Sequence, residues 1–162
     1  HDEGARRAPE RIEHGSLETQ HRRARNQKDQ PAREQRPVFR HCPGEQVLAA
    51  EIAAGNKRYD EAIARLQRAV LLQDGLMYNE PPDWYFPVRH YLGAVLLEAG
   101  LAQEAEAVYW QDLALYRENG YSLLGLQKAL EAQGRGGEAV GFAERQRKAF
   151  AEADVKLTTS RF

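Results

Sequence analysis

The spacing of small and large residues between Leu92 and Tyr109 constrains the fold most. Gly93 follows Leu92 directly, Ala105 comes twelve positions after that glycine, and Tyr109 comes four positions later. Apolar residues recur three or four positions apart on both sides of Gly100, which is typical of two short helices joined by a tight turn. Small residues at Gly93 and Ala105 allow two antiparallel helices to approach closely. The stretch therefore predicts a packed helix pair.

This pattern resembles the tetratricopeptide repeat, which has a leucine-glycine step on its first helix and an alanine four positions before a large residue on its second. Leu124 and Gly125 repeat that step, and Ala139 follows Ala105 by 34 residues, the period of the repeat. Ala62 precedes Ala105 by 43 residues, so a loop interrupts the array between these copies. The resemblance implies an all-α fold of antiparallel helix pairs, stacked as a short solenoid of about three repeats.

The composition divides the chain into two parts. Residues 1–44 are rich in arginine and proline and contain few large apolar residues, which predicts a poorly ordered tail. Residues 45–162 carry the repeats, for which we expect the ranges 46–74, 84–117 and 120–157.

Three details of the helices follow from local signals. An apolar stripe of Val47, Leu48, Ile52 and Ala53 predicts the inner face of the opening helix. Asp83 is typical of an N-cap, so we expect the next helix to begin at residue 84. In the third repeat we expect a long turn over residues 134–137, a second helix from residue 138 through 157, and a short non-helical end.

Residues 46–162 also resemble the C-terminal end of longer bacterial repeat proteins, in segments such as 78–89 and 119–126. That resemblance implies further repeats ahead of this region in the full protein, and no particular reaction. Two functions remain open. One is a non-enzymatic module that presents a concave surface to a peptide or partner protein. The alternative is an accessory or regulatory region of a larger bacterial enzyme or regulator.

The first helix of each pair lines the concave surface of such an array. We expect the partner-binding groove to include residues of the second and third pairs, with Lys128 nearby: His90, Tyr91, Ala94, Leu97, Glu98, Ser122 and Leu126. For His90 an ordinary position on the helix surface is the competing interpretation.

Family members that bind the acidic C-termini of chaperones use a clamp of basic and amide side chains on these helices. Alignment of the repeat pattern places other residues at the clamp positions: Val47, Glu51, Tyr91, Asn119 and Leu123. No basic pair is among them. A chaperone tail is therefore disfavoured, and the expected partner is another protein or peptide.

Four aromatic residues gather around the loop between the first two repeats: Tyr78, Trp84, Tyr85 and Phe86. Such a cluster is a possible contact surface for a partner, because aromatic side chains dominate binding hot spots. We favour the other interpretation, in which the cluster fills the gap that a long insertion leaves between helix pairs.

Asp112 occupies a position that is normally alanine in the repeat, close to the start of the next one. A carboxylate there needs hydrogen-bond donors, which the backbone or Ser122 at the start of the third repeat can provide. We expect a structural role for Asp112 alongside Gly93, Ala105 and Gly125. A general base is the alternative, but no nucleophile, metal pair or phosphate loop accompanies it, so the sequence predicts no catalytic residue and no enzyme.

Composition limits the other classes of function. The net charge is −1 and the isoelectric point about 6.6, which indicates no overall bias toward nucleic acid or anionic membranes, although residues 1–44 could form a weakly basic arm. No apolar run approaches the roughly 18 residues of a membrane span. The single cysteine, Cys42, allows no internal disulfide, and His14 and His21 are seven residues apart, which is unusual for a metal pair.

We therefore expect no cofactor, no metal and no membrane partner, and no oligomeric state follows from the sequence. The chain begins at His1 and its one methionine is Met77, which suggests a processed form or a fragment. Cytoplasm is the expected compartment.

Overall fold

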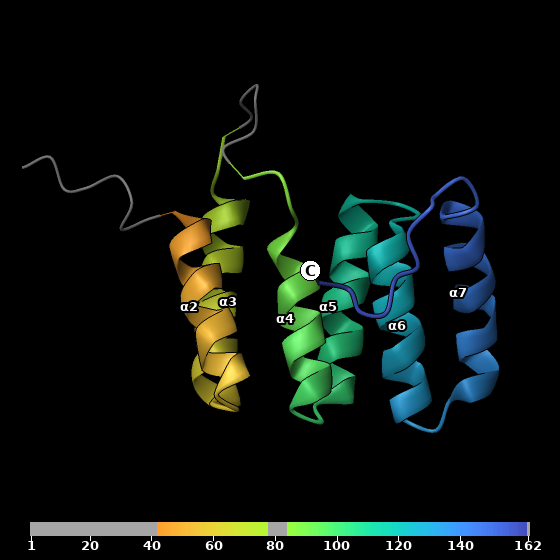
Figure 1. Cartoon of the computed structure of the whole chain (residues 1–162), viewed down its shortest axis with the longest axis horizontal. Helices are drawn as coiled ribbons and strands as arrows, with labels where there is room; N and C mark the ends of the chain where they lie inside the picture. The colour runs from red at the N-terminus through yellow and green to blue at the C-terminus, as the bar shows by residue number, and fades with distance from the viewer. Residues whose placement is uncertain (1–41, 78–83, 162) are drawn as a thin grey trace, which may run out of the picture. The chain divides into compact units, whose positions relative to one another are not determined.

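The structure, a computed structural model, describes residues 42–77 and 84–161, and these residues form helices without strands (Figure 1). All of them belong to one compact unit, residues 38–162. The helices are α2 (Pro43–Gly55), α3 (Tyr59–Asp74), α4 (Val88–Glu98), α5 (Ala102–Leu115), α6 (Gly120–Ala132) and α7 (Gly136–Ala149). The predicted all-α class is confirmed, whereas the expectation of a poorly ordered tail over residues 1–44 falls almost entirely outside the described residues.

The helices pack as three antiparallel pairs, α2 with α3, α4 with α5, and α6 with α7. Consecutive pairs join through contacts of α3 with α4 and of α5 with α6. Helix α4 also contacts both α2 and α6, so the first helices of the three pairs are neighbours. This is the stacked arrangement that the repeat pattern predicts.

The same three-residue turn joins the two helices of every pair. Its middle residue has a positive φ, which is 58° at Lys57, 79° at Gly100 and 74° at Gly134. The amide of the next residue then donates to the carbonyl five residues earlier, at 2.9 Å in all three turns, which caps the first helix. The third turn is therefore no longer than the others. Because α7 begins at Gly136, the expectation of a turn through residue 137 is wrong.

The ring of Tyr109 lies between two glycines of neighbouring first helices. A Cβ atom added to Gly93 on α4 would lie 2.3 Å from Tyr109 Cζ, and one added to Gly125 on α6 would lie 2.1 Å from the same atom. No real Cβ tolerates such distances, so both positions need glycine. Gly93 thus makes room for an aromatic ring from α5, which is more specific than the close helix approach expected from its size.

Helix α7 ends at Ala149, so the expectation that it continues through Leu157 is wrong. The chain leaves the helix because Phe150 packs onto the start of α6. A Cβ on Gly120 would lie 2.1 Å from Phe150 Cε2, and the ring centroids of Phe150 and Tyr121 are 5.6 Å apart. Residues 151–161 then run back across α6 and α5 toward α4 without helical structure (Figure 1).

Two other features of the helices, the start of α4 and the buried face of α2, differ from what the sequence predicts. Helix α4 begins at Val88 with Pro87 as its N-cap, so the residues from 84 to 86 precede the helix. On α2 the buried apolar side chains include Val47 and Ala53, whereas Leu48 and Ile52 are exposed. The reason is that α2 packs against α3 and α4, and the stripe expected from the sequence was wider than the face that these two helices cover.

The gap for Tyr109 gives a stability prediction. We expect Gly93→Ala to lower the free energy of unfolding by about 1–3 kcal/mol, because the added methyl group meets the Tyr109 ring. Gly141→Ala on α7 is the matched control, since a Cβ there meets nothing within 4 Å. It should raise stability by about 0.5–1 kcal/mol through helix propensity. Urea unfolding measures both; equal effects at the two glycines would contradict this packing.

Candidate partner-binding groove

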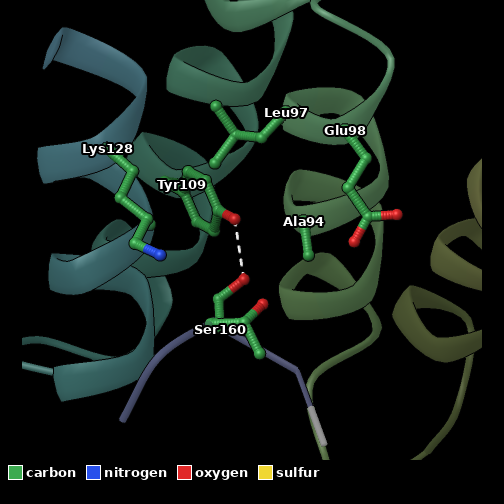
Figure 2. A pocket seen from close by; sticks show the side chains of 8 residues that line it. Ala94, Leu97, Glu98, Tyr109, Lys128 and Ser160 are labelled. Carbon is green, nitrogen blue, oxygen red and sulfur yellow. Dashed lines mark hydrogen bonds between the residues drawn. The ribbon is translucent and has the colours of Figure 1, made fainter. Parts of the chain in front are cut away.

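A pocket of about 270 Å³ opens beside Tyr109, on the side of the array where α4 and α6 lie (Figure 2). Three helices line it: α4 contributes Ala94, Leu97 and Glu98, α5 contributes Tyr109, and α6 contributes Gly125 and Lys128. Thr159 and Ser160 complete the lining. The pocket and the faces of α2, α4 and α6 next to it are called the groove below.

The structure places the predicted groove residues in two different environments. Ala94, Leu97 and Glu98 line the pocket, and Tyr91 is half-buried. The other three, His90, Ser122 and Leu126, are buried in the core. Both sequence interpretations of the His90 side chain, a groove contact and an ordinary surface position, are therefore wrong.

A buried polar cluster explains the position of His90. Asp112 is 0% exposed, and its Oδ2 accepts a hydrogen bond from Ser122 Oγ at 2.6 Å. His90 Nε2 lies 3.0 Å from the same oxygen. One residue from each of α4, α5 and α6 thus meets at a single carboxylate oxygen. Of the donors expected for Asp112 at the start of the third repeat, Ser122 is the one that binds it. The contact of Asp112 with His90 on α4 was not predicted, because a histidine on a first helix gives no sign of burial.

Aromatic rings cover this cluster. The Phe86 ring meets His90 edge-on at 4.9 Å between centroids, and Tyr121 stacks on His90 at 5.5 Å. Trp84 packs on α2, where a Cβ on Gly44 would lie 2.8 Å from its Cζ3. The positions of Trp84 and Phe86 thus agree with the favoured interpretation, in which aromatic residues fill the gap between helix pairs. Tyr85, in contrast, is 79% exposed. Tyr78, the fourth member of the predicted aromatic cluster, is outside the described residues.

The cluster does not have the geometry of a nucleophilic site. The Ser122 hydroxyl is buried and donates to Asp112 rather than to His90, so the serine-histidine pair of such a site is not formed. His90 and Asp112 are both buried, at 1% and 0% exposure, which separates them from any molecule in the groove. In the described part of the chain, no group of three or more His, Cys, Asp or Glu residues could hold a metal ion. No helix described is long and apolar enough to cross a membrane.

Residues 158–161, called the groove segment below, lie in the groove itself. Lys128 Nζ on α6 donates to the carbonyl of Thr158. Ser160 Oγ lies 2.7 Å from Tyr109 Oη on α5 (Figure 2). It also donates to the His90 carbonyl on α4 at 2.9 Å. No sequence signal predicted these contacts, because a short polar stretch after the last helix has no hydrophobic periodicity.

Arg161 ends the groove segment between two glutamates on different helices. Its Nη1 lies 2.5 Å from Glu51 Oε1 on α2, and its Nη2 lies 2.6 Å from Glu98 Oε1 on α4. In the alignment to the repeat pattern, Glu51 occupies one of the positions at which repeat proteins that bind chaperone tails carry their clamp. The sequence therefore contained the sign that the groove is acidic at this end, although not the arginine that it faces.

Burial is the main influence on the Tyr109 hydroxyl. It raises the pKa of Tyr109 well above its ordinary value, while the hydrogen bond with Ser160 acts in the opposite direction. The folded chain thus keeps this phenol neutral as a hydrogen-bonding group at the bottom of the groove.

The buried carboxylate gives a second prediction. Asp112→Ala should lower the free energy of unfolding by about 1–3 kcal/mol, because Ser122 and His90 lose their shared acceptor. Asp112→Asn should cost less, since one amide oxygen can still accept. Glu144→Ala, at an exposed position on α7, is the control and should change stability by less than about 0.5 kcal/mol. Thermal or urea unfolding measures all three, and an Asp112→Ala chain as stable as the control would contradict this structural role.

The raised pKa of Tyr109 gives a third prediction. Unfolded tyrosine ionises near pH 10, whereas folded Tyr109 stays neutral, so the stability that this group contributes is present below pH 10 and decreases as the pH rises further. Tyr109→Phe keeps a ring between the glycines but has no proton to lose. Urea unfolding at pH 8 and pH 10.5 should show a smaller loss of stability for Tyr109→Phe than for the unsubstituted chain. Equal losses would mean that Tyr109 is not the buried phenol described here.

Among solved structures the chain is similar to the MamA protein, a helical repeat protein of the tetratricopeptide type, with a TM-score of 0.55 and 18% identity. The match covers 72% of this chain and 61% of that one, so the chain spans less than two thirds of the length of MamA. No protein-family model and no curated protein sequence matches the chain. At this identity the likeness shows the fold alone, an all-α array of tetratricopeptide-type helix pairs.

Proposed function

We propose that the chain is a protein-interaction module that binds an extended segment of a partner protein in the groove. The fold supports this coarsely, because helical repeats expose long concave surfaces and commonly bind peptides there. The observation that carries the proposal is the groove segment. Three of its four residues, Thr158, Ser160 and Arg161, make polar contacts with side chains or carbonyls of α2, α4, α5 and α6.

The contacts are of the kinds that recognise peptides elsewhere. Lys128 binds a backbone carbonyl, which every peptide offers regardless of its sequence. Tyr109 and the His90 carbonyl bind a side-chain hydroxyl at a buried position. Ala94 and Leu97 give the pocket an apolar wall. The groove thus combines contacts that give affinity with contacts that depend on sequence.

A matched pair of leucine substitutions tests the proposal. Leu97→Arg puts a long charged side chain into the groove, whereas Leu115→Arg changes an exposed leucine on α5 outside it. Proteins captured from the native host by the unsubstituted chain should be lost with Leu97→Arg and retained with Leu115→Arg. Circular dichroism confirms that both variants fold. If both variants capture the same proteins as the unsubstituted chain, the groove is not the binding surface.

A further inference from the structure

We propose that the groove selects an extended peptide in which a small hydroxyl residue precedes an arginine, and that residues 158–161 of this chain occupy it as an internal competitor. The inference rests on the proposed function and specifies its ligand. The partner is thus a protein segment with a Ser-Arg or Thr-Arg step.

The arginine site is built from two facing helices. Glu51 on α2 and Glu98 on α4 each contact a different nitrogen of the Arg161 guanidinium, at 2.5 and 2.6 Å. The Arg161 side chain is only 16% exposed, so water competes less for it than for an ordinary surface ion pair. The planar guanidinium can contact two carboxylates at once, which the ammonium of lysine does less well. The site therefore favours arginine over lysine.

The two glutamates need a cation from the segment in the groove. Among the ion pairs of the described residues, Arg161 is the partner of both Glu51 and Glu98. Without it, two carboxylates on neighbouring helices remain near each other without a counter-ion, which is unfavourable. A second arginine, carried by a partner, restores the neutralisation. The acidic end of the groove is thus the converse of the basic clamp that binds acidic chaperone tails.

The position before the arginine accepts only a small side chain with a hydroxyl. Ser160 is buried, and its Oγ satisfies both the Tyr109 hydroxyl and the His90 carbonyl. Alanine at this place leaves two buried polar groups without that partner. A larger residue would have to displace its neighbours, because Ser160 is 2% exposed and Tyr109 is itself fixed between Gly93 and Gly125. The groove thus recognises a hydroxyl and a guanidinium at adjacent positions of the bound peptide.

The groove segment competes because it is part of the same chain. A tethered ligand acts at an effective concentration of about millimolar for a short flexible connection. A partner segment of the same chemistry must displace it before binding. Binding of the partner should therefore be weaker in the unsubstituted chain than in a chain whose own segment has lost its contacts.

A labelled peptide tests this directly. The probe is residues 155–161 with an N-terminal fluorescein and an amidated C-terminus, so that no new carboxylate lies beside the arginine. By fluorescence anisotropy, the full chain with Ser160→Ala and Arg161→Ala should bind this peptide at least tenfold more tightly than the unsubstituted chain. Arg147→Ala, which removes an exposed arginine from α7, is the matched control and should bind like the unsubstituted chain. Equal binding by all three chains would overturn the competition.

The specificity is tested in the same doubly substituted chain, Ser160→Ala with Arg161→Ala. It is called the weakened chain because its own groove segment is held less tightly. A probe with alanine in place of its arginine should bind at least tenfold more weakly. Adding Glu51→Gln and Glu98→Gln to the chain should weaken the arginine probe by a similar factor and leave the alanine probe unchanged, because the two losses concern the same contact. Equal affinity for both probes would overturn the arginine assignment.

Two further results separate the possible failures. If the weakened chain binds neither probe while Leu97→Arg still abolishes partner capture, the ligand assignment is wrong and the proposed function stands. If the unsubstituted chain self-associates in sedimentation experiments, and Arg161→Ala abolishes the association, the segment occupies the groove of a second copy and the internal arrangement is overturned.

Discussion

The rest of the groove depends on the ring of Tyr109 between Gly93 and Gly125. The ring comes from a second helix and passes between two first helices, and this gap exists only because both facing residues lack a Cβ. Its hydroxyl thereby reaches the groove, where it meets Ser160 (Figure 2). A core residue of the repeat thus also forms part of the surface that contacts an extended segment. Packing and recognition are joined in one side chain.

The buried carboxylate of Asp112 supports this arrangement from the other side of the core. It ties α5 to α4 through His90 and to α6 through Ser122, and these are the three helices that line the pocket of the groove. The His90 carbonyl in turn accepts the hydrogen bond from Ser160. An alanine at position 112, as the repeat usually has, would leave α4 and α6 without this polar link. We therefore interpret the departure from the repeat pattern as a support for the groove and not as a catalytic group.

The sequence predicted what depends on periodicity and size, and missed what depends on long-range polar contacts. The spacing of Gly93, Ala105 and Gly125 predicts the helix pairs, because small residues at fixed intervals are a local signal. The burial of His90 was missed, since its hydrogen-bond partner Asp112 lies 22 residues away in the chain. The groove segment was missed for the same reason: Ser160 and Arg161 bind residues between 51 and 110 positions earlier. Glu51 at a clamp position was the one available sign.

The central claim is that Ser160 lies against Tyr109 at the bottom of the groove, and nuclear magnetic resonance tests it most directly. Their oxygens are 2.7 Å apart, so the β-protons of Ser160 and the ε-protons of the Tyr109 ring should give a nuclear Overhauser cross-peak. The amide of Ser160 should also exchange slowly with solvent, because the residue is 2% exposed. Arg161→Ala should weaken both signals. A Ser160 with random-coil chemical shifts, fast exchange and no cross-peak to Tyr109 would contradict the account.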